Sequence, residues 1–200
     1  MPTPSVAVLK ITLDDVEPAV MRRIAVPADI RLDRLHLVIQ AAMGWTNSHL
    51  YEFRIGDTGW GEPDPYGFRD GPLEAKKGRL AAVLADAGRK TFDYLYDFGD
   101  GWSHTVMLEK VAPAVEGEPT IRLIDAVGRC PPEDCGGPPG YEELLEILGD
   151  PDHEEHEERL EWCGDPFDPL DAGRPALESA IAGLARGWAP RRRATPKSKA

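Results

Sequence analysis

The chain has 200 residues, 35 of them acidic and 23 of them lysine or arginine, which gives a formal net charge of −12 at pH 7. A body this acidic repels a phosphate backbone, which argues against a broad nucleic-acid surface. No run approaches the roughly 18 apolar residues of a membrane span, so we expect no membrane contact. The cysteine count is three, an odd number that argues against a secreted disulfide framework, and the first residues lack a signal-peptide pattern. We therefore expect a cytoplasmic protein.

Basic residues are concentrated at the C-terminus. From Arg186 onward the chain has six basic residues and no acidic one. We therefore expect one domain over residues 1–186, long enough for a single hydrophobic core, followed by a disordered basic tail over residues 187–200. The tail leaves weak DNA association open as an alternative function.

The N-terminal quarter of the chain predicts two strands, a helix and a third strand. The strands cover Val6–Leu13, Val20–Val26 and Leu50–Ile55, and the helix covers Leu32–Met43, with an apolar stripe at spacings of three and four. Neighbouring residues of a strand point to opposite faces, so the paired arginines of the second strand cannot easily serve one site. The opening hairpin followed by a helix resembles a β-grasp start.

The segment Thr91–Lys110 predicts a β-hairpin, because aromatic and apolar residues alternate with polar ones on both sides of a short turn. Asp100 and Gly101 suit a two-residue type I′ turn, which needs positive φ at both central positions. With that turn, Asp97 is expected to lie opposite His104, with Cβ atoms roughly 4.5–5.5 Å apart.

The remaining segments complete an α+β pattern. Gly56–Pro72 is a long loop rich in glycine and proline, and Cys130–Gly140 contains too many prolines and glycines for regular structure. The other predicted elements are a helix at Leu80–Ala87, a strand at Thr120–Val127, and C-terminal helices at Tyr141–Leu148, Asp152–Cys163 and Pro175–Arg186. We predict an α+β fold with a mostly antiparallel sheet of about five to six strands, a helix packed on it, and acidic C-terminal helices.

Asp97 and His104 are the candidate catalytic residues. A carboxylate that accepts a hydrogen bond from one imidazole nitrogen fixes the tautomer and raises the basicity of the other nitrogen, which suits a general base or a metal ligand. Cys130 and Cys135, with His104, are candidate ligands for a divalent metal, although one cysteine pair is less specific than two Cys-x-x-Cys knuckles. The alternative interpretations are a polar cross-strand pair and two reduced thiols in a rigid loop, and no cofactor is predicted.

A second set of residues predicts a recognition surface, because aromatic side chains in loops are typical of binding sites. The loop Trp60–Phe68, the end of the hairpin and the Cys130–Gly140 loop would form it. The candidate binding residues are Trp45, Asn47, His49, Trp60, Asp100, Trp102 and Tyr141. The expected partner is a protein or a peptide.

Several blocks in the same order resemble the plasmid pRiA4b ORF-3-like family, which includes passenger proteins of insertion sequences. The blocks lie between about Val6 and Leu170 and are Val20–Pro27, Leu35–Phe53, Tyr94–His104, Cys130–Leu148, Asp150–Trp162 and Phe167–Pro169. One departure is Met21, where the family pattern has a tryptophan before the paired arginines. The resemblance implies a fold and an association with plasmids and mobile elements, but no reaction.

The function expected from the sequence is a non-catalytic binding or accessory module, because no constellation reaches catalytic specificity. The first alternative is a metal-assisted hydrolase that uses His104 and Asp97 with cysteine or histidine ligands. The second alternative is DNA association through the tail.

Overall fold

The computed structural model describes residues 4–63, 71–164 and 166–188. Their fold is α+β, with one eight-stranded sheet in the order β5-β4-β3-β6-β7-β1-β2-β8. All neighbouring strands pair antiparallel except β4 and β5, which pair parallel. The strands are β1 (Ser5–Leu13), β2 (Val20–Pro27), β3 (Tyr51–Ile55), β4 (Thr58–Gly61), β5 (Leu73–Glu74), β6 (Thr91–Tyr96), β7 (Trp102–Pro113) and β8 (Arg122–Val127). The helices are α1 (Leu32–Met43), the short 3-10 helix η1 (Ala75–Lys77), α2 (Leu80–Ala87), α3 (Gly137–Gly149), α4 (His156–Cys163) and α5 (Arg174–Trp188).

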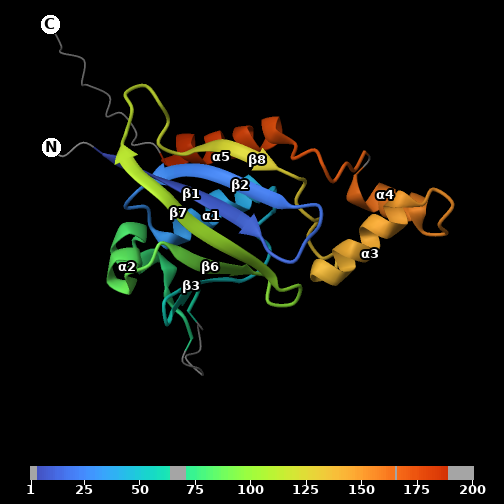
Figure 1. The fold of residues 1–200 in the computed structure, drawn as a ribbon, viewed down its shortest axis with the longest axis horizontal. Coiled ribbons are helices and arrows are strands. Elements are labelled where there is room, and N and C mark those ends of the chain that lie inside the picture. The colour runs from blue at the N-terminus through green and yellow to red at the C-terminus, as the bar shows by residue number, and fades with distance from the viewer. Residues whose placement is uncertain (1–3, 64–70, 165, 189–200) are drawn as a thin grey trace, which may run out of the picture.

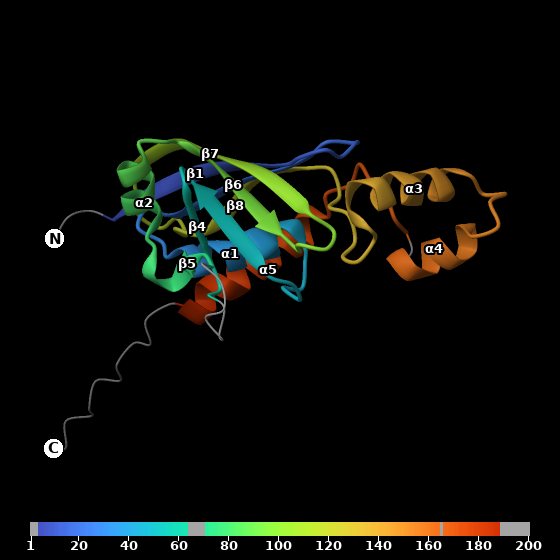
Figure 2. The same ribbon diagram turned by 90° about the horizontal axis from the view of Figure 1, so that it is seen from below.

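Helices α1 and α5 lie together on one face of the sheet (Figure 2). Helices α3 and α4 project from one end of the sheet, whereas α2 lies at the other end (Figure 1). Among the described residues, no helix is both long enough and apolar enough to span a bilayer. The predicted fold class and the hairpin-then-helix start are confirmed.

The main core lies between the sheet and α1. Leu35, Val38, Ile39 and Ala42 are all fully buried, as the spacing of apolar residues in this segment predicts. The helix ends at Gly44, whose φ of 90° is left-handed and whose N–H donates to the carbonyl oxygen of Gln40. A left-handed glycine is a common helix C-cap because it has no Cβ to clash.

The paired arginines of β2 serve opposite faces of the sheet, as strand geometry predicts. Arg22 is fully buried, and its guanidinium donates to the carbonyl oxygens of Ala42 at 2.7 Å and Val127 at 2.7 Å. It therefore satisfies a carbonyl in the last turn of α1, which has no partner within the helix. Arg23 points outward and pairs with Glu109 at 2.9 Å.

The predicted number of strands was too low, because β4 and β5 were missed. β4 lies inside the predicted loop Gly56–Pro72 and pairs with β3, and β5 follows directly after that loop. Both strands are short, β5 forms the edge of the sheet, and β4 is rich in glycine, so neither has the alternating pattern that predicts a strand. Tyr66 and Phe68 of the predicted aromatic loop lie outside the described residues.

The predicted turn and register of the central hairpin were wrong. Tyr96 pairs with Trp102 and Tyr94 pairs with His104, so Asp97 does not lie opposite His104. The connection spans residues 97–101, and the N–H of Gly101 donates to the carbonyl oxygen of Asp97 at 2.7 Å. Asp97 has left-handed backbone with φ of 55°, which ends the strand at Tyr96, and its N–H donates to the carbonyl oxygen of Leu50 at 2.9 Å, a long-range contact.

The C-terminal elements also differ from the prediction in their bounds. α3 begins at Gly137, so the irregular segment is shorter than the predicted Cys130–Gly140. Two prolines in its first turn favour this start, because a proline there lacks only an N–H that has no helical partner. α5 continues past the predicted domain end to Trp188. The tail from residue 189 onward lies outside the described residues.

Candidate functional site

Three loops meet at the end of the sheet from which α3 projects. They are the α1–β3 loop (residues 44–50), the hairpin turn (residues 97–101) and the β8–α3 loop (residues 128–136). In both ribbon views the hairpin turn lies next to the start of α3 (Figures 1 and 2). We call this region the loop site.

The hydroxyl of Tyr96, at the end of β6, joins two of these loops. It accepts hydrogen bonds from the N–H groups of Ser48 at 3.0 Å and His49 at 3.3 Å, and it donates to Oε1 of Glu133. The other carboxylate oxygen of Glu133 accepts from the N–H of Thr46 at 2.9 Å and from its hydroxyl. Burial alone would raise the pKa of Glu133, but the hydrogen bonds from Thr46 and Tyr96 outweigh it and lower that pKa.

A buried network beneath the α1–β3 loop fixes its backbone. His36 contacts the hydroxyl of Tyr94 through Nδ1 at 2.7 Å and Oδ1 of Asn47 through Nε2. Because the amide oxygen can only accept, Nε2 carries the proton and Nδ1 accepts from the Tyr94 hydroxyl. Gln40 completes the network, since its Nε2 donates to the Tyr94 hydroxyl at 3.0 Å and its Oε1 accepts from the N–H of Asn47 at 3.1 Å.

Trp45 ties the α1–β3 loop to the β8–α3 loop from below. Its indole stacks on the Tyr96 ring with 4.9 Å between centroids, and its Nε1 donates to the carbonyl oxygen of Pro131 at 2.9 Å. The N–H of Gly136 donates to Oδ2 of Asp100 at 3.2 Å and so ties the hairpin turn to the start of α3. The three loops are therefore held by several independent contacts.

At the surface of the loop site, His49 lies between two carboxylates. Its Nδ1 is 3.6 Å from Oδ2 of Asp97, and its Nε2 is 3.2 Å from Oδ1 of Asp134. One ligand atom from each of the three side chains lies within 4.8 Å of the others. Nε2 is buried but lacks hydrogen-bond geometry toward any described residue. The other oxygen of Asp97 accepts from the N–H of Gly99 at 2.9 Å, which fixes the orientation of this carboxylate.

Each of the three loops contains a residue other than glycine with left-handed backbone. These residues are Asn47 with φ of 61°, Asp97 with φ of 55° and Asp134 with φ of 62°. Asparagine and aspartate tolerate this conformation better than most residues, yet it still costs free energy and tends to cluster at functional sites. The backbone is therefore strained where the ligand-type side chains meet.

A model of the family described as plasmid pRiA4b ORF-3-like protein matches residues 5–174. The chain belongs to this family. Uncharacterized protein y4hQ of Sinorhizobium fredii (strain NBRC 101917 / NGR234) is 55% identical over 186 residues, which cover 92% of this chain and 95% of that protein. The crystal structure of MM3350 from Methanosarcina mazei Go1, a protein of unknown function, is similar with a TM-score of 0.75 and 36% identity. That match covers 84% of this chain and 95% of the crystallised chain.

The structure separates the binding residues expected in this pRiA4b ORF-3-like chain into three groups. His49 lies at the surface of the loop site, 3.6 Å from the candidate catalytic residue Asp97, and Asp100 lies on the hairpin turn, where it accepts from the N–H of Gly136. Trp60 lies on β4 opposite Phe53, outside the three loops. Trp45, Trp102 and Tyr141 are buried, whereas Asn47 is exposed on the α1–β3 loop and its side chain bonds to the buried His36.

The other candidate catalytic and metal-binding residues are not grouped as expected. His104 is fully buried and its Nδ1 donates to the carbonyl oxygen of Tyr94 at 3.0 Å. Burial raises the pKa of Cys135 to about 12 and that of Cys130 further, so both remain thiols. Among the described residues, the side chains of His49, Asp97 and Asp134 are the three ligand-type groups close enough to share one ion. Neither His104 nor either cysteine belongs to this group.

Sequence reasoning missed Glu133 and Asp134, the two acidic residues of the β8–α3 loop. They lie between Pro132 and Cys135 in the loop that the sequence predicts as part of the recognition surface, where only the cysteines are candidate ligands. Adjacent carboxylates in a loop stiffened by prolines were the available signal, because such a loop presents side chains in fixed directions. The sequence does not pair Asp97 with His49, because His49 comes from another loop.

We predict that Tyr96→Phe lowers the free energy of unfolding by about 1–3 kcal/mol, because Glu133 and the N–H groups of two loop residues lose a partner. Tyr141→Phe is the matched control, since the Tyr141 hydroxyl is buried without a hydrogen-bond partner among the described residues. Urea unfolding of both variants measures the difference. Equal stabilities of the two variants would contradict the role assigned to the Tyr96 hydroxyl.

Proposed function

We propose that the loop site binds a divalent cation through His49, Asp97 and Asp134, and that the chain is a binding module whose recognition surface depends on this cation. The observation that carries the proposal is the convergence of one imidazole and two carboxylates from three loops within 4.8 Å. Ligand atoms around one ion at roughly 2.0–2.6 Å must lie about this close together.

The chemistry of the ligands favours a transition-metal dication. Imidazole nitrogen suits zinc, iron and other first-row metals, and carboxylate oxygen suits manganese and magnesium. A mixed nitrogen and oxygen set therefore fits zinc, iron or manganese better than calcium. The hydrogen bond from Gly99 to Asp97 supports this use, because oriented ligands bind a metal more tightly than free ones.

Three protein ligands also favour a second candidate function, metal-assisted hydrolysis. Structural zinc sites usually have four protein ligands, whereas catalytic sites have three and leave a position for water or substrate. In this alternative His49 takes the place that the sequence assigned to His104. Turnover of a generic phosphodiester or ester substrate that requires added metal and is lost in His49→Ala would favour hydrolysis over binding alone.

We predict that the purified protein binds about one Zn²⁺ or Mn²⁺ per chain, and that His49→Ala and Asp97→Asn each weaken this binding at least tenfold. Asp97→Asn keeps an oxygen for the N–H of Gly99, so the hairpin turn is retained. Elemental analysis and calorimetric titration with each metal alone measure the stoichiometry and affinity.

Two variants serve as controls for the metal titration. Cys130→Ser/Cys135→Ser tests the cysteine site, and His153→Gln removes an exposed histidine outside the loop site. Both should bind metal as the unmodified protein does. Loss of metal only in the cysteine variant, or no metal in any protein, would reduce the three side chains to an ion-paired cluster and overturn the proposal.

The three cysteines are free thiols in the structure. A reducing compartment such as the cytoplasm keeps cysteines in this form. This state supports the predicted cytoplasmic location, which cell fractionation would test.

A further inference from the structure

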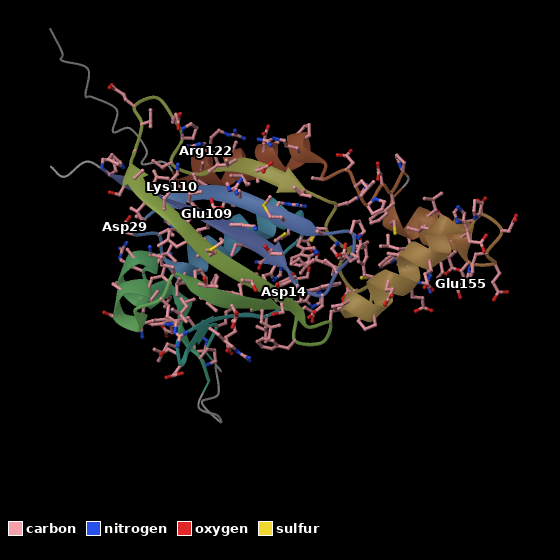
Figure 3. All side chains as sticks on the ribbon, viewed as in Figure 1. Asp14, Asp29, Glu109, Lys110, Arg122 and Glu155 are labelled. Atoms are coloured by element: carbon pink, nitrogen blue, oxygen red, sulfur yellow. The ribbon has the colours of Figure 1, made fainter. Side chains whose placement is uncertain are left out.

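A groove of about 970 Å³ lies between α5, the segment that enters α1 and the segment that enters β8. We call it the arginine groove. Arg122 and Asp29, two of its lining residues, lie at the end of the molecule opposite to Glu155, which precedes α4 (Figure 3). The arginine groove is therefore remote from α3 and the loop site.

The floor of the arginine groove is apolar. Ile30, Ile121, Leu123 and Ile181 line it, and each is at least nine-tenths buried. Trp188, at the end of α5, adds a half-buried aromatic wall. The volume lies within the roughly 300–1,000 Å³ that is typical of small-molecule sites.

The rim of the arginine groove is positively charged, although the whole chain has a net charge of −12. Five arginines and two carboxylates line the groove. The arginines are Arg31, Arg34, Arg79, Arg122 and Arg186, and the carboxylates are Asp29 and Glu178. A concave surface of this sign attracts an anion and repels the basic C-terminal tail.

The arginines differ in whether a carboxylate already neutralises them. Arg31 makes two hydrogen bonds to Asp33 at 2.7 and 2.9 Å, and Arg79 and Arg122 have acidic partners of their own. Arg34 and Arg186, by contrast, have no carboxylate partner among the described residues. The Arg34 guanidinium lies over the Trp188 ring, 5.0 Å from its centroid, and is thereby held at the mouth of the groove.

We infer that the arginine groove binds a small anionic amphiphile. Its carboxylate or phosphate head contacts Arg34 and Arg186, and its hydrocarbon body lies along Ile30, Ile181 and Trp188. A guanidinium presents paired donors that match a carboxylate or a phosphate. Burial of the hydrocarbon supplies the remaining affinity. This inference is independent of the proposed cation site.

The test uses the fluorescent anion anilinonaphthalene sulfonate as a probe on the full chain. We expect it to bind with 1:1 stoichiometry, and dodecanoate and dodecyl phosphate to displace it at concentrations at least tenfold lower than dodecanol. Arg34→Gln/Arg186→Gln should weaken the probe and both anions at least tenfold, because each charge-assisted contact contributes to affinity. Arg54→Gln/Arg89→Gln is the matched control, since it removes two exposed arginines outside the groove.

Three results would overturn the inference. The first is unchanged affinity in Arg34→Gln/Arg186→Gln, and the second is equal displacement by dodecanol and dodecanoate. The third is probe binding only after residues 189–200 are deleted, which would make the tail the occupant. Carboxylate and phosphate heads are distinguished by their relative affinities, and circular dichroism establishes that each variant is folded.

Discussion

Lowering the pH from 7 to 5 is expected to reduce the free energy of unfolding by about 4 kcal/mol, because two buried histidines are neutral in the native state. Burial lowers the pKa of His36 to about 4 and that of His104 to about 4, from an ordinary value of 6.5. The unfolded chain therefore takes up protons below pH 6.5 while the native state does not, so stability falls as the pH falls. Each histidine contributes about 2 kcal/mol of this loss over the interval.

The native environment explains why neither ring can accept a proton. His36 stacks on Tyr51 with 3.5 Å between centroids, and its Nδ1 already accepts from a hydroxyl. His104 is fully buried, and its Nε2 has no acceptor among the described residues. An imidazolium at either position would be a buried charge without a counter-ion, which costs several kcal/mol.

Urea unfolding between pH 7.5 and 4.5 measures the effect, and ring nitrogen shifts in NMR assign it to the two histidines. His153→Gln should keep the same dependence on pH, because His153 is exposed. The pKa of Glu133 is lowered in the native state from its ordinary value of 4.5. Glu133 therefore adds to the loss of stability only at pH values near and below 4.5. A ring of His36 or His104 that titrates above pH 6 would contradict the prediction.

Gly137→Ala is expected to lower the free energy of unfolding by about 2–5 kcal/mol. Gly137 has φ of +71°, and a Cβ atom there would lie 2.3 Å from the carbonyl oxygen of Asp100. The left-handed backbone accounts for about 1–2 kcal/mol, and displacement of the hairpin turn accounts for the rest. The substitution should also weaken metal binding, since it separates the turn that carries Asp97 from the loop that carries Asp134.

Gly101→Ala is the matched control for the steric part of this effect. Gly101 has φ of +73°, and a Cβ atom there would meet nothing within 4 Å. It should therefore cost only the conformational part, about 1–2 kcal/mol. Urea unfolding of both variants gives the two values, and equal values would show that the close approach of Gly137 to the hairpin turn is not tight.

The residues of the proposed cation site were only partly predictable because they come from separate loops. The sequence identifies Asp97 and His49 as chemical candidates, but it pairs Asp97 with His104 through a turn that looks two residues long. In the structure the connection spans residues 97–101, and the N–H of Asp97 donates to the carbonyl oxygen of Leu50, far away in the chain. No local pattern encodes that contact.

The sequence by itself determined the elements whose signals are local. The bounds of α1 and α2 follow from apolar spacing and from terminal glycines, and the opposite orientations of Arg22 and Arg23 follow from strand geometry. These features depend on neighbours within a few residues. Tertiary structure alone decided the hairpin register, the short strands β4 and β5, the approach of Asp134 to His49 and the sign of charge in the arginine groove. Each depends on contacts between segments distant in the chain, where packing and hydrogen bonding outweigh local preference.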